Sequence, residues 1–207
     1  MVRTMGPSET TCGMGFRPGV NKRAAIAALS GGLGLYGLAV TGALSLDLGW
    51  GRTSRRLGPQ ELTIAAPRPV VFDVVAGPYL DRTPRAMAAK LQVLERGTDM
   101  VLAAHFTPLP GGLKATTVET VRFERPERIS FRLARGPVPH VEETFELSEL
   151  NGDQTRLVYR GELAADLWVL GRLWGRAVAR TWERTVASSL DGVRAEAERI
   201  ATVTTAR

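Results

Sequence analysis

The chain has 207 residues, of which 44% are hydrophobic and 23% are charged, as in an ordinary globular protein and unlike a fibrous or wholly disordered one. Its one cysteine, Cys12, excludes an intramolecular disulfide and a thiolate-based metal cluster, and its two histidines exclude a three-histidine zinc site. The formal net charge is +6, but residues 59–164 carry 13 basic and 14 acidic side chains, so the body of the chain is neutral and gives no support for nucleic-acid binding.

The N-terminal part divides into a tail and an apolar run. Residues 1–23 show no hydrophobic periodicity and are predicted to be a disordered tail. Residues 24–46 form a run of 23 residues without a charge. As an α-helix the run would reach about 34 Å, enough for a bilayer core of about 30 Å. We therefore predict a single-pass transmembrane helix at 24–46.

Two alternatives remain for this run: a cleaved secretory signal and a buried soluble helix. The run is longer than a typical signal core, and its five glycines would destabilise a helix in water. Three basic residues closely precede the run and three follow it, so the positive-inside comparison gives no preference. The side of the membrane is therefore open, and the cytoplasmic face is the expected location. Residues 47–58 are predicted to be a basic linker.

The body begins with an alternating segment, 60–66, which predicts a strand. Pro67 and the apolar cluster at 70–75 predict that a short helix follows directly, and Gly77-Pro78 is expected to end it. A second amphipathic segment lies around 83–90. Six further strands, separated by short turns typical of an antiparallel meander, are predicted at about 91–96, 99–106, 113–124, 128–134, 140–149 and 154–163.

A long amphipathic helix is predicted at 165–201. Apolar residues recur there at helical spacing for more than 30 residues, from Leu167 and Leu170 to Ile200. Four arginines fall on the opposite face at intervals of four: Arg172, Arg176, Arg180 and Arg184.

Two segments carry a family resemblance. Residues 62–78 read LTIAAPRPVVFDVVAGP, and residues 155–163, before the last helix, read TRLVYRGEL. They resemble the opening strand and helix and the closing strand of the START-like, or SRPBCC, superfamily, in its polyketide cyclase/dehydrase-like group. The resemblance implies an α+β helix-grip fold over residues 59–201, with a seven-stranded antiparallel sheet curled around the C-terminal helix and a short tail at 202–207. The superfamily includes lipid carriers, plant hormone receptors, cyclases and oxygenase subunits, so fold alone does not settle the activity.

Strand alternation identifies polar side chains in phase with the core. Glu119 shares a face with Val121 and Phe123, and Glu143 shares one with Val141 and Phe145; Tyr159 is likewise in phase with its apolar neighbours. A buried carboxylate costs several kcal/mol unless it is hydrogen-bonded or neutralised, so these positions are candidate ligand contacts or acid/base groups. His105 alternates with Val101 and Ala103 and is a further candidate. A strand bulge or a structural partner would make any of these residues purely structural.

Tryptophans and arginines of the last helix give two further candidate surfaces. Trp174 and Trp182 either line a hydrophobic ligand site or simply pack in the core. The arginines at 172–184 form either a solvated face or a surface that contacts an anionic membrane leaflet, and salt dependence would separate the two.

The remaining motifs exclude several chemistries. The chain contains neither G-x-S-x-G nor H-E-x-x-H, and the glycine-rich segment 31–34 lies inside the apolar run without a preceding strand. No metal and no cofactor are expected.

Three functions follow, in order of preference. The first is a membrane-anchored module that binds a hydrophobic small molecule, a lipid or a polyketide-like compound, between the sheet and the last helix. The second is a cyclase- or dehydrase-type enzyme in which the inward Glu, Tyr and His side chains act as general acid and base, which requires at least two of them to converge. The third is an anchored protein-interaction module without a ligand.

Overall fold

The computed structural model describes residues 34–35, 37–80, 89–109 and 112–205. The chain divides into two compact units, Met1–Gly34 and Leu35–Arg207. The predicted tail at 1–23 and most of the predicted span lie outside the described residues. The architecture below is that of the second unit.

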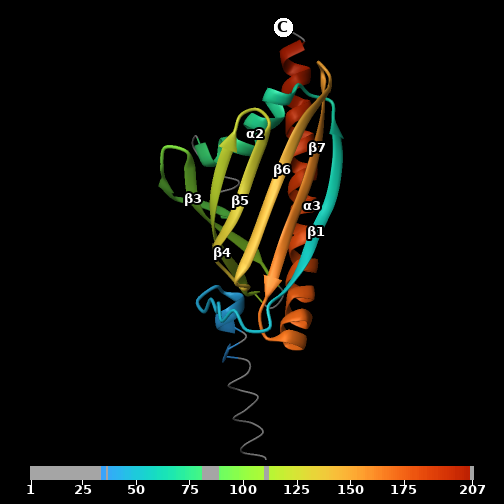
Figure 1. Cartoon of the computed structure of the whole chain (residues 1–207). Helices are drawn as coiled ribbons and strands as arrows, with labels where there is room; N and C mark the ends of the chain where they lie inside the picture. Colours follow the sequence, from blue (N-terminus) through green and yellow to red (C-terminus); the bar gives the residue numbers. More distant parts are fainter. Residues whose placement is uncertain (1–33, 36, 81–88, 110–111, 206–207) are drawn as a thin grey trace, which may run out of the picture. The chain divides into compact units, whose positions relative to one another are not determined.

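One antiparallel sheet organises this unit (Figure 1). Its strand order is β1-β7-β6-β5-β4-β3-β2, so consecutive strands are neighbours and β1 pairs with the last strand. This confirms the predicted seven-stranded meander, and the six strands from β2 to β7 match the predicted ranges within two residues. The strands are β1 (Thr53–Ile64), β2 (Leu91–Arg96), β3 (Met100–Pro108), β4 (Lys114–Glu124), β5 (Arg128–Arg135), β6 (His140–Asn151) and β7 (Gln154–Ala165).

The first strand begins seven residues earlier than the sequence pattern predicts. Thr53 already pairs with Ala165 of β7, so only residues 47–52 remain of the predicted linker at 47–58. The basic residues that suggested a linker are tolerated because β1 is an edge strand with one side exposed to solvent. Leu57 within this stretch is almost completely buried, which ties the strand to the core.

The first helix of the body, α2 (Arg68–Leu80), runs past the position where it was predicted to end. Pro78 lies inside its last turn, and both Pro78 and Tyr79 are buried. Pro78 cannot donate the helical hydrogen bond to the carbonyl of Val74, and burial of Pro78 and Tyr79 holds the last turn in place instead. The amphipathic segment predicted at 83–90 lies outside the described residues except for Ala89 and Lys90, which are in a turn.

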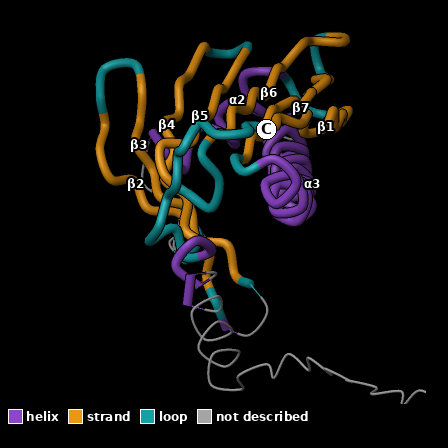
Figure 2. The backbone as a smooth tube through the Cα atoms, turned by 60° about the horizontal axis from the view of Figure 1, so that its bottom comes forward, coloured by secondary structure: helices purple, strands orange, loops and turns teal. Residues whose placement is uncertain are grey.

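The long helix α3 (Trp168–Thr205) lies along one face of the sheet, against β1 and β7, and also contacts α2 (Figures 1 and 2). It starts three residues later and ends four residues later than predicted, so most of the expected tail at 202–207 is helical. Val186, Leu190 and Ala197 are buried against the sheet, as the spacing predicts. The prediction is wrong at the start of the helix, because Leu167 is 39% and Leu170 is 69% exposed.

The end of the charge-free run belongs to the domain. Residues 37–40 are helical, but residues 41–46 are not, so a helix that continues to Leu46 is wrong for these last six positions. Val40 is buried, and the carbonyl of Gly42 accepts a 2.6 Å hydrogen bond from Nε of Arg135 on β5. Gly42 has a φ of +70°, and a side chain there would collide with the backbone of Thr116, which explains the glycine. Within the described ranges, no helix has the length and hydropathy of a membrane span.

Candidate functional site

The inner face of the sheet, on which α3 packs against β1 and β7 and α2 packs against β3 and β6, carries buried polar side chains among apolar ones. Strand alternation predicted this orientation for three residues, and the fold confirms their burial: Glu119 is 5% exposed, Glu143 is 6% exposed and Tyr159 is fully buried. Their role in binding remains a prediction. Burying a carboxylate is unfavourable unless hydrogen bonds or opposite charges compensate it, so the partners of the two glutamates define the site.

Glu143 on β6 is held by two neutral donors. Its Oε1 accepts a 2.5 Å hydrogen bond from the hydroxyl of Tyr159 on β7 and a 2.6 Å bond from Nε1 of Trp182 on α3. Gly161 lies directly opposite Glu143 in the strand pairing, and a Cβ there would lie 3.2 Å from Glu143 Cγ. A side chain at position 161 would therefore crowd the Glu143 side chain and the carbonyl of Glu142, 2.8 Å from such a Cβ.

Glu119 on β4 pairs with His105 on β3. His105 Nδ1 lies 3.2 Å from Glu119 Oε2, an ion-pair distance without the alignment of a hydrogen bond. Thr117 donates its hydroxyl to Glu119 Oε1 at 2.7 Å, and the hydroxyl of Tyr79 lies 2.9 Å from His105 Nε2. The histidine therefore lies between an acidic and a phenolic side chain, contributed by β4 and α2.

The two glutamates have opposite protonation tendencies. Burial raises the pKa of Glu143 to about 7, and the negative charge of Glu119 acts in the same direction. Burial would also raise the pKa of Glu119, but the charge of His105, with the hydrogen bond from Thr117, holds it below the usual value. Burial would lower the pKa of His105, and the charge of Glu119 outweighs this and raises it. The site therefore places Glu119 and His105, whose mutual attraction favours the charged form of each, beside a Glu143 whose pKa lies near neutrality.

A row of aromatic rings connects the two polar groups across the inner face. Tyr79 and His105 both contact Phe131, which packs edge-on against Phe145 with ring centroids 5.4 Å apart. Phe145 in turn contacts Tyr159 at 5.3 Å. Such contacts fix ring orientation and add to the apolar burial, so the polar groups lie in a largely apolar surrounding.

The structure separates the two tryptophans that the sequence grouped together. Nε1 of Trp182 reaches Glu143, whereas Nε1 of Trp174 donates to the carbonyl of Pro137 at the end of the sheet where β6 begins. Sequence reasoning did not identify Tyr79, because the helix was expected to end at Pro78. It also did not identify the hydrogen bond from Thr117 to Glu119, although the two residues are in phase on the same strand. No local signal in the sequence indicates the Tyr79–His105 contact.

The four arginines of α3 are exposed, on the side of the helix away from the core, as predicted. Arg180 and Arg184 line a surface hollow of about 450 Å³ together with Glu183 and Ala187. This hollow lies outside the buried polar groups of the inner face. Within the described part of the chain, no group of three or more His, Cys, Asp or Glu side chains is arranged to hold a metal ion.

Known proteins resemble the chain in sequence pattern and fold. Residues 64–188 match the family described as polyketide cyclase / dehydrase and lipid transport. No curated protein sequence matches the chain. Among solved structures, the Zhui aromatase/cyclase from Streptomyces sp. R1128 is similar at 20% identity and a TM-score of 0.59, covering 71% of this chain and 95% of that one.

Two further solved structures share the fold. A protein from Thermus thermophilus gives 20% identity and a TM-score of 0.54, with 70% of this chain and 97% of that chain covered. A START superfamily protein from Mycobacterium smegmatis gives 14% identity and a TM-score of 0.51, with 72% and 98% covered. At these identities the likeness establishes the helix-grip architecture.

Proposed function

Because the chain belongs to the polyketide cyclase/dehydrase and lipid transport family, we propose that it binds a hydrophobic small molecule, a lipid or polyketide-like compound, between the inner face of the sheet and α3. A polar group of this molecule contacts Glu143 and the Glu119–His105 pair, and its apolar part lies along the aromatic row.

One observation carries the proposal: two carboxylates are buried on the same face with neutral or histidine partners. Among the described residues, neither Glu119 nor Glu143 forms an ion pair with Arg or Lys. A carboxylate that serves only stability is better replaced by an apolar side chain, since the desolvation cost often exceeds the gain. Two such residues beside a row of aromatic rings therefore favour recognition of a ligand that has both polar and apolar parts.

A second candidate function is a cyclase- or dehydrase-type enzyme, and the opposite protonation tendencies of the two glutamates favour it. Glu143 carries a proton over part of the neutral range and is suited to act as a general acid, while Glu119 with His105 is suited to act as a base. The sequence argument required at least two such groups to converge. Glu143 contacts Tyr159, and His105 contacts Glu119, but the proposed acid and base belong to different pairs, which are joined through the rings of Phe131 and Phe145. The enzyme therefore requires a substrate that reaches both pairs.

The membrane anchor is a separate part of the proposal. It rests on the charge-free residues from 24 onward; with the helix ending at residue 40, these are 17 residues, or about 26 Å, the lower limit for a span. With the ligand site next to a membrane, an apolar molecule would pass between bilayer and protein without crossing much water.

The test is mass spectrometry of small molecules extracted from the full chain after purification from a membrane-containing host. We expect an apolar compound in near-equal molar amount. The Glu143→Gln variant should co-purify with at least about tenfold less of the compound, because a hydrogen bond to a charged group is lost. Glu142→Gln is the matched control, since Glu142 is the neighbouring residue on the exposed face and pairs with Arg132.

The same extract separates the two functions. If the protein is a binding module, the wild type and Glu143→Gln give the same compound, and the variant gives less of it. A dehydrating cyclase gives a product from the wild type and a precursor heavier by one water from the variant. An empty wild-type protein that also takes up no fluorescent fatty acid would contradict the lipid-binding module. It would leave the protein-interaction module, or an enzyme whose substrate the host does not make.

A further inference from the structure

An apolar surface is exposed where β7 turns into α3, far from the polar groups of the inner face. Two chain segments contribute to it. Residues 46–50 present Trp50, which is 68% exposed, and residues 167–173 present Trp168, 62% exposed, and Leu170, 69% exposed. We call this surface the corner patch; its members are Leu46, Leu48, Trp50, Leu167, Trp168, Val169, Leu170 and Leu173. Soluble proteins rarely expose so many large apolar side chains together unless the surface binds something.

The two segments are joined by their backbones. The amide of Leu167 donates to the carbonyl of Trp50 at 2.7 Å, and the amide of Trp168 donates to the carbonyl of Gly51 at 3.0 Å. The ring of Trp168 lies so close to Gly51 that a Cβ there would be 2.3 Å from the ring. Glycine is therefore required at position 51, and the Trp168 ring contacts the chain there while most of its side chain stays exposed.

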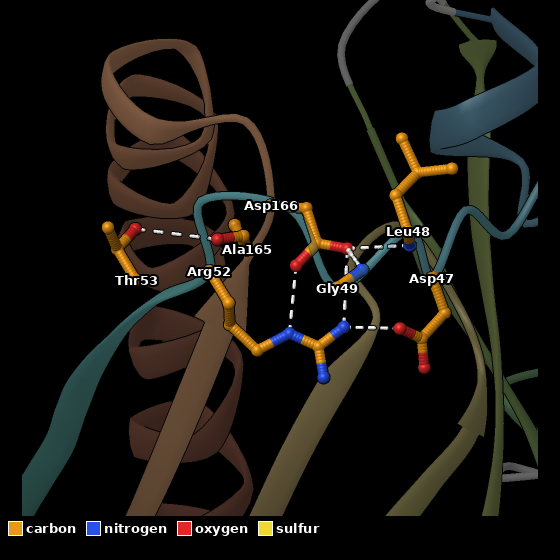
Figure 3. Close-up of polar contacts among 7 residues, drawn as sticks. All are labelled: Asp47, Leu48, Gly49, Arg52, Thr53, Ala165 and Asp166. Carbon is orange, nitrogen blue, oxygen red and sulfur yellow. Dashed lines mark hydrogen bonds and ion pairs between the residues drawn. The ribbon is translucent and has the colours of Figure 1, made fainter.

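A buried carboxylate holds the turn together (Figure 3). Asp166, 8% exposed, accepts hydrogen bonds from the amides of Leu48 and Gly49 at 2.7 and 2.8 Å, and from Nε of Arg52 at 2.8 Å. Arg52 also binds Asp47, so both acidic residues of the two segments are neutralised by the same guanidinium. Because their charges are neutralised, Asp47 and Asp166 do not repel an anionic partner.

The backbone at the turn directs the apolar side chains outward. Leu167 and Trp168 have φ angles of 74° and 46°, a left-handed conformation that is uncommon for bulky residues. Strained conformations of this kind persist where the surrounding structure enforces them and cluster at functional positions. The Asp166 hydrogen bonds and the two backbone bonds provide that enforcement here.

Exposed arginines adjoin the patch. Arg172 and Arg176 lie on the next turns of α3 and are exposed, without a partner in any ion pair of the described residues. Tryptophan and leucine beside arginine form the combination that enters the interface of a bilayer, where indole rings lie at headgroup level and arginines meet lipid phosphates. The charge-free run of the sequence also ends at Leu46, the first residue of the patch.

We propose that the corner patch docks on the surface of an anionic lipid bilayer, with Trp50, Trp168 and Leu170 inserted at the headgroup boundary and Arg172 and Arg176 on lipid phosphates. This surface belongs to the folded domain, so it would orient the domain on the bilayer whether or not the N-terminal run spans the membrane.

Fluorescence quenching by brominated lipid tests the proposal with the full chain. Vesicles of phosphatidylcholine and phosphatidylglycerol with brominated acyl chains quench only indoles that enter the bilayer. Trp174 and Trp182 provide a constant background, since their Nε1 atoms bond to Pro137 and Glu143 inside the domain. We expect clear quenching of the wild type and a fall to this background in the Trp50→Phe/Trp168→Phe variant.

Paired arginine variants test the charge contribution. Arg172→Gln/Arg176→Gln should reduce the quenching on phosphatidylglycerol vesicles to the level seen on phosphatidylcholine alone, and high salt should do the same to the wild type. Arg180→Gln/Arg184→Gln, about 12 Å further along the helix, is the matched control and should retain the wild-type quenching. Urea unfolding of each variant establishes that it is folded.

Three results would overturn the proposal. If the wild type floats with the vesicles but the tryptophan variant is quenched equally, the N-terminal run holds the protein to the bilayer and the patch does not touch it. If the chain does not float at all, there is no docking. If Trp50 and Trp168 become shielded on self-association in solution and are not quenched by lipid, the patch binds a second copy of the chain.

Discussion

Glu143 and Glu119 are buried on the same face of one sheet, yet their surroundings move their pKa values in opposite directions. Glu143 has only neutral donors, a phenol and an indole, so burial dominates. Glu119 has a histidine, whose positive charge overcomes the effect of burial. The identity of one neighbouring side chain therefore decides which of two identical residues is protonated near neutral pH.

Stability should reveal the titration of Glu143. Its pKa rises from about 4.3 in an unfolded chain to about 7 in the fold, so the folded state binds more protons within this window. The stabilising contribution is complete below the unfolded value and is lost as the pH rises through the folded value. The unfolding free energy of the wild type, relative to Glu143→Gln, should therefore fall by about 3 kcal/mol between about pH 5 and about pH 8.

Urea unfolding followed by circular dichroism at several pH values measures this difference. Because the comparison is between two proteins that differ only at position 143, the titrations of groups away from the inner face cancel, and the difference reports Glu143 together with the Glu119–His105 pair that its charge influences. A difference that is flat with pH would mean that Glu143 is ionised in the folded protein, and the general-acid role would fail with it.

At the scale of elements, the junction between β7 and α3 depends on residues more than 100 positions earlier in the chain. Asp166 directly follows β7 and binds the amides of Leu48 and Gly49 and the side chain of Arg52, all just before β1. Since β1 pairs with β7 from Thr53 onward, the same contacts fix the start of the edge strand and the direction of α3. One carboxylate thereby connects the first strand, the last strand and the long helix.

Asp166→Asn should loosen this junction. The amide keeps the shape of the side chain but loses the charge and one acceptor atom, so we expect a loss of about 1.5–3 kcal/mol in unfolding free energy. Glu61→Gln is the control, because Glu61 binds Arg156 in an exposed ion pair that contributes less. Equal losses in urea unfolding for the two variants would show that Asp166 has no special structural role.

At the scale of the whole molecule, the sheet and α3 share one interior, so a bound ligand should stabilise the entire domain. Removing the co-purified molecule should lower the unfolding free energy, and returning it at about a hundredfold excess over its Kd should restore about 3 kcal/mol. Thermal unfolding of extracted and reloaded full chain measures this change. An unchanged melting temperature would mean that the domain's own side chains fill its interior.

Much of the fold follows from local pattern. Alternation with a period of two predicted the strands from β2 to β7, and apolar spacing near 3.6 predicted α3. The same alternation predicted that Glu119, Glu143 and Tyr159 face inward, since side-chain direction in a strand is fixed by the backbone alone. The first strand was predicted too short because its arginines and proline read as a linker, whereas an edge strand accepts them.

The sequence by itself thus determined the order of elements, the inward direction of the two glutamates and the family. Only the tertiary structure decided what those glutamates contact, since Trp182 is 39 residues from Glu143 in sequence and Tyr79 is 26 residues from His105. It also decided that Leu170 is exposed although its spacing matches the core. The physical reason is that periodicity records only which way a side chain points. Burial, charge and pKa depend on which distant segments lie across from it and exclude water.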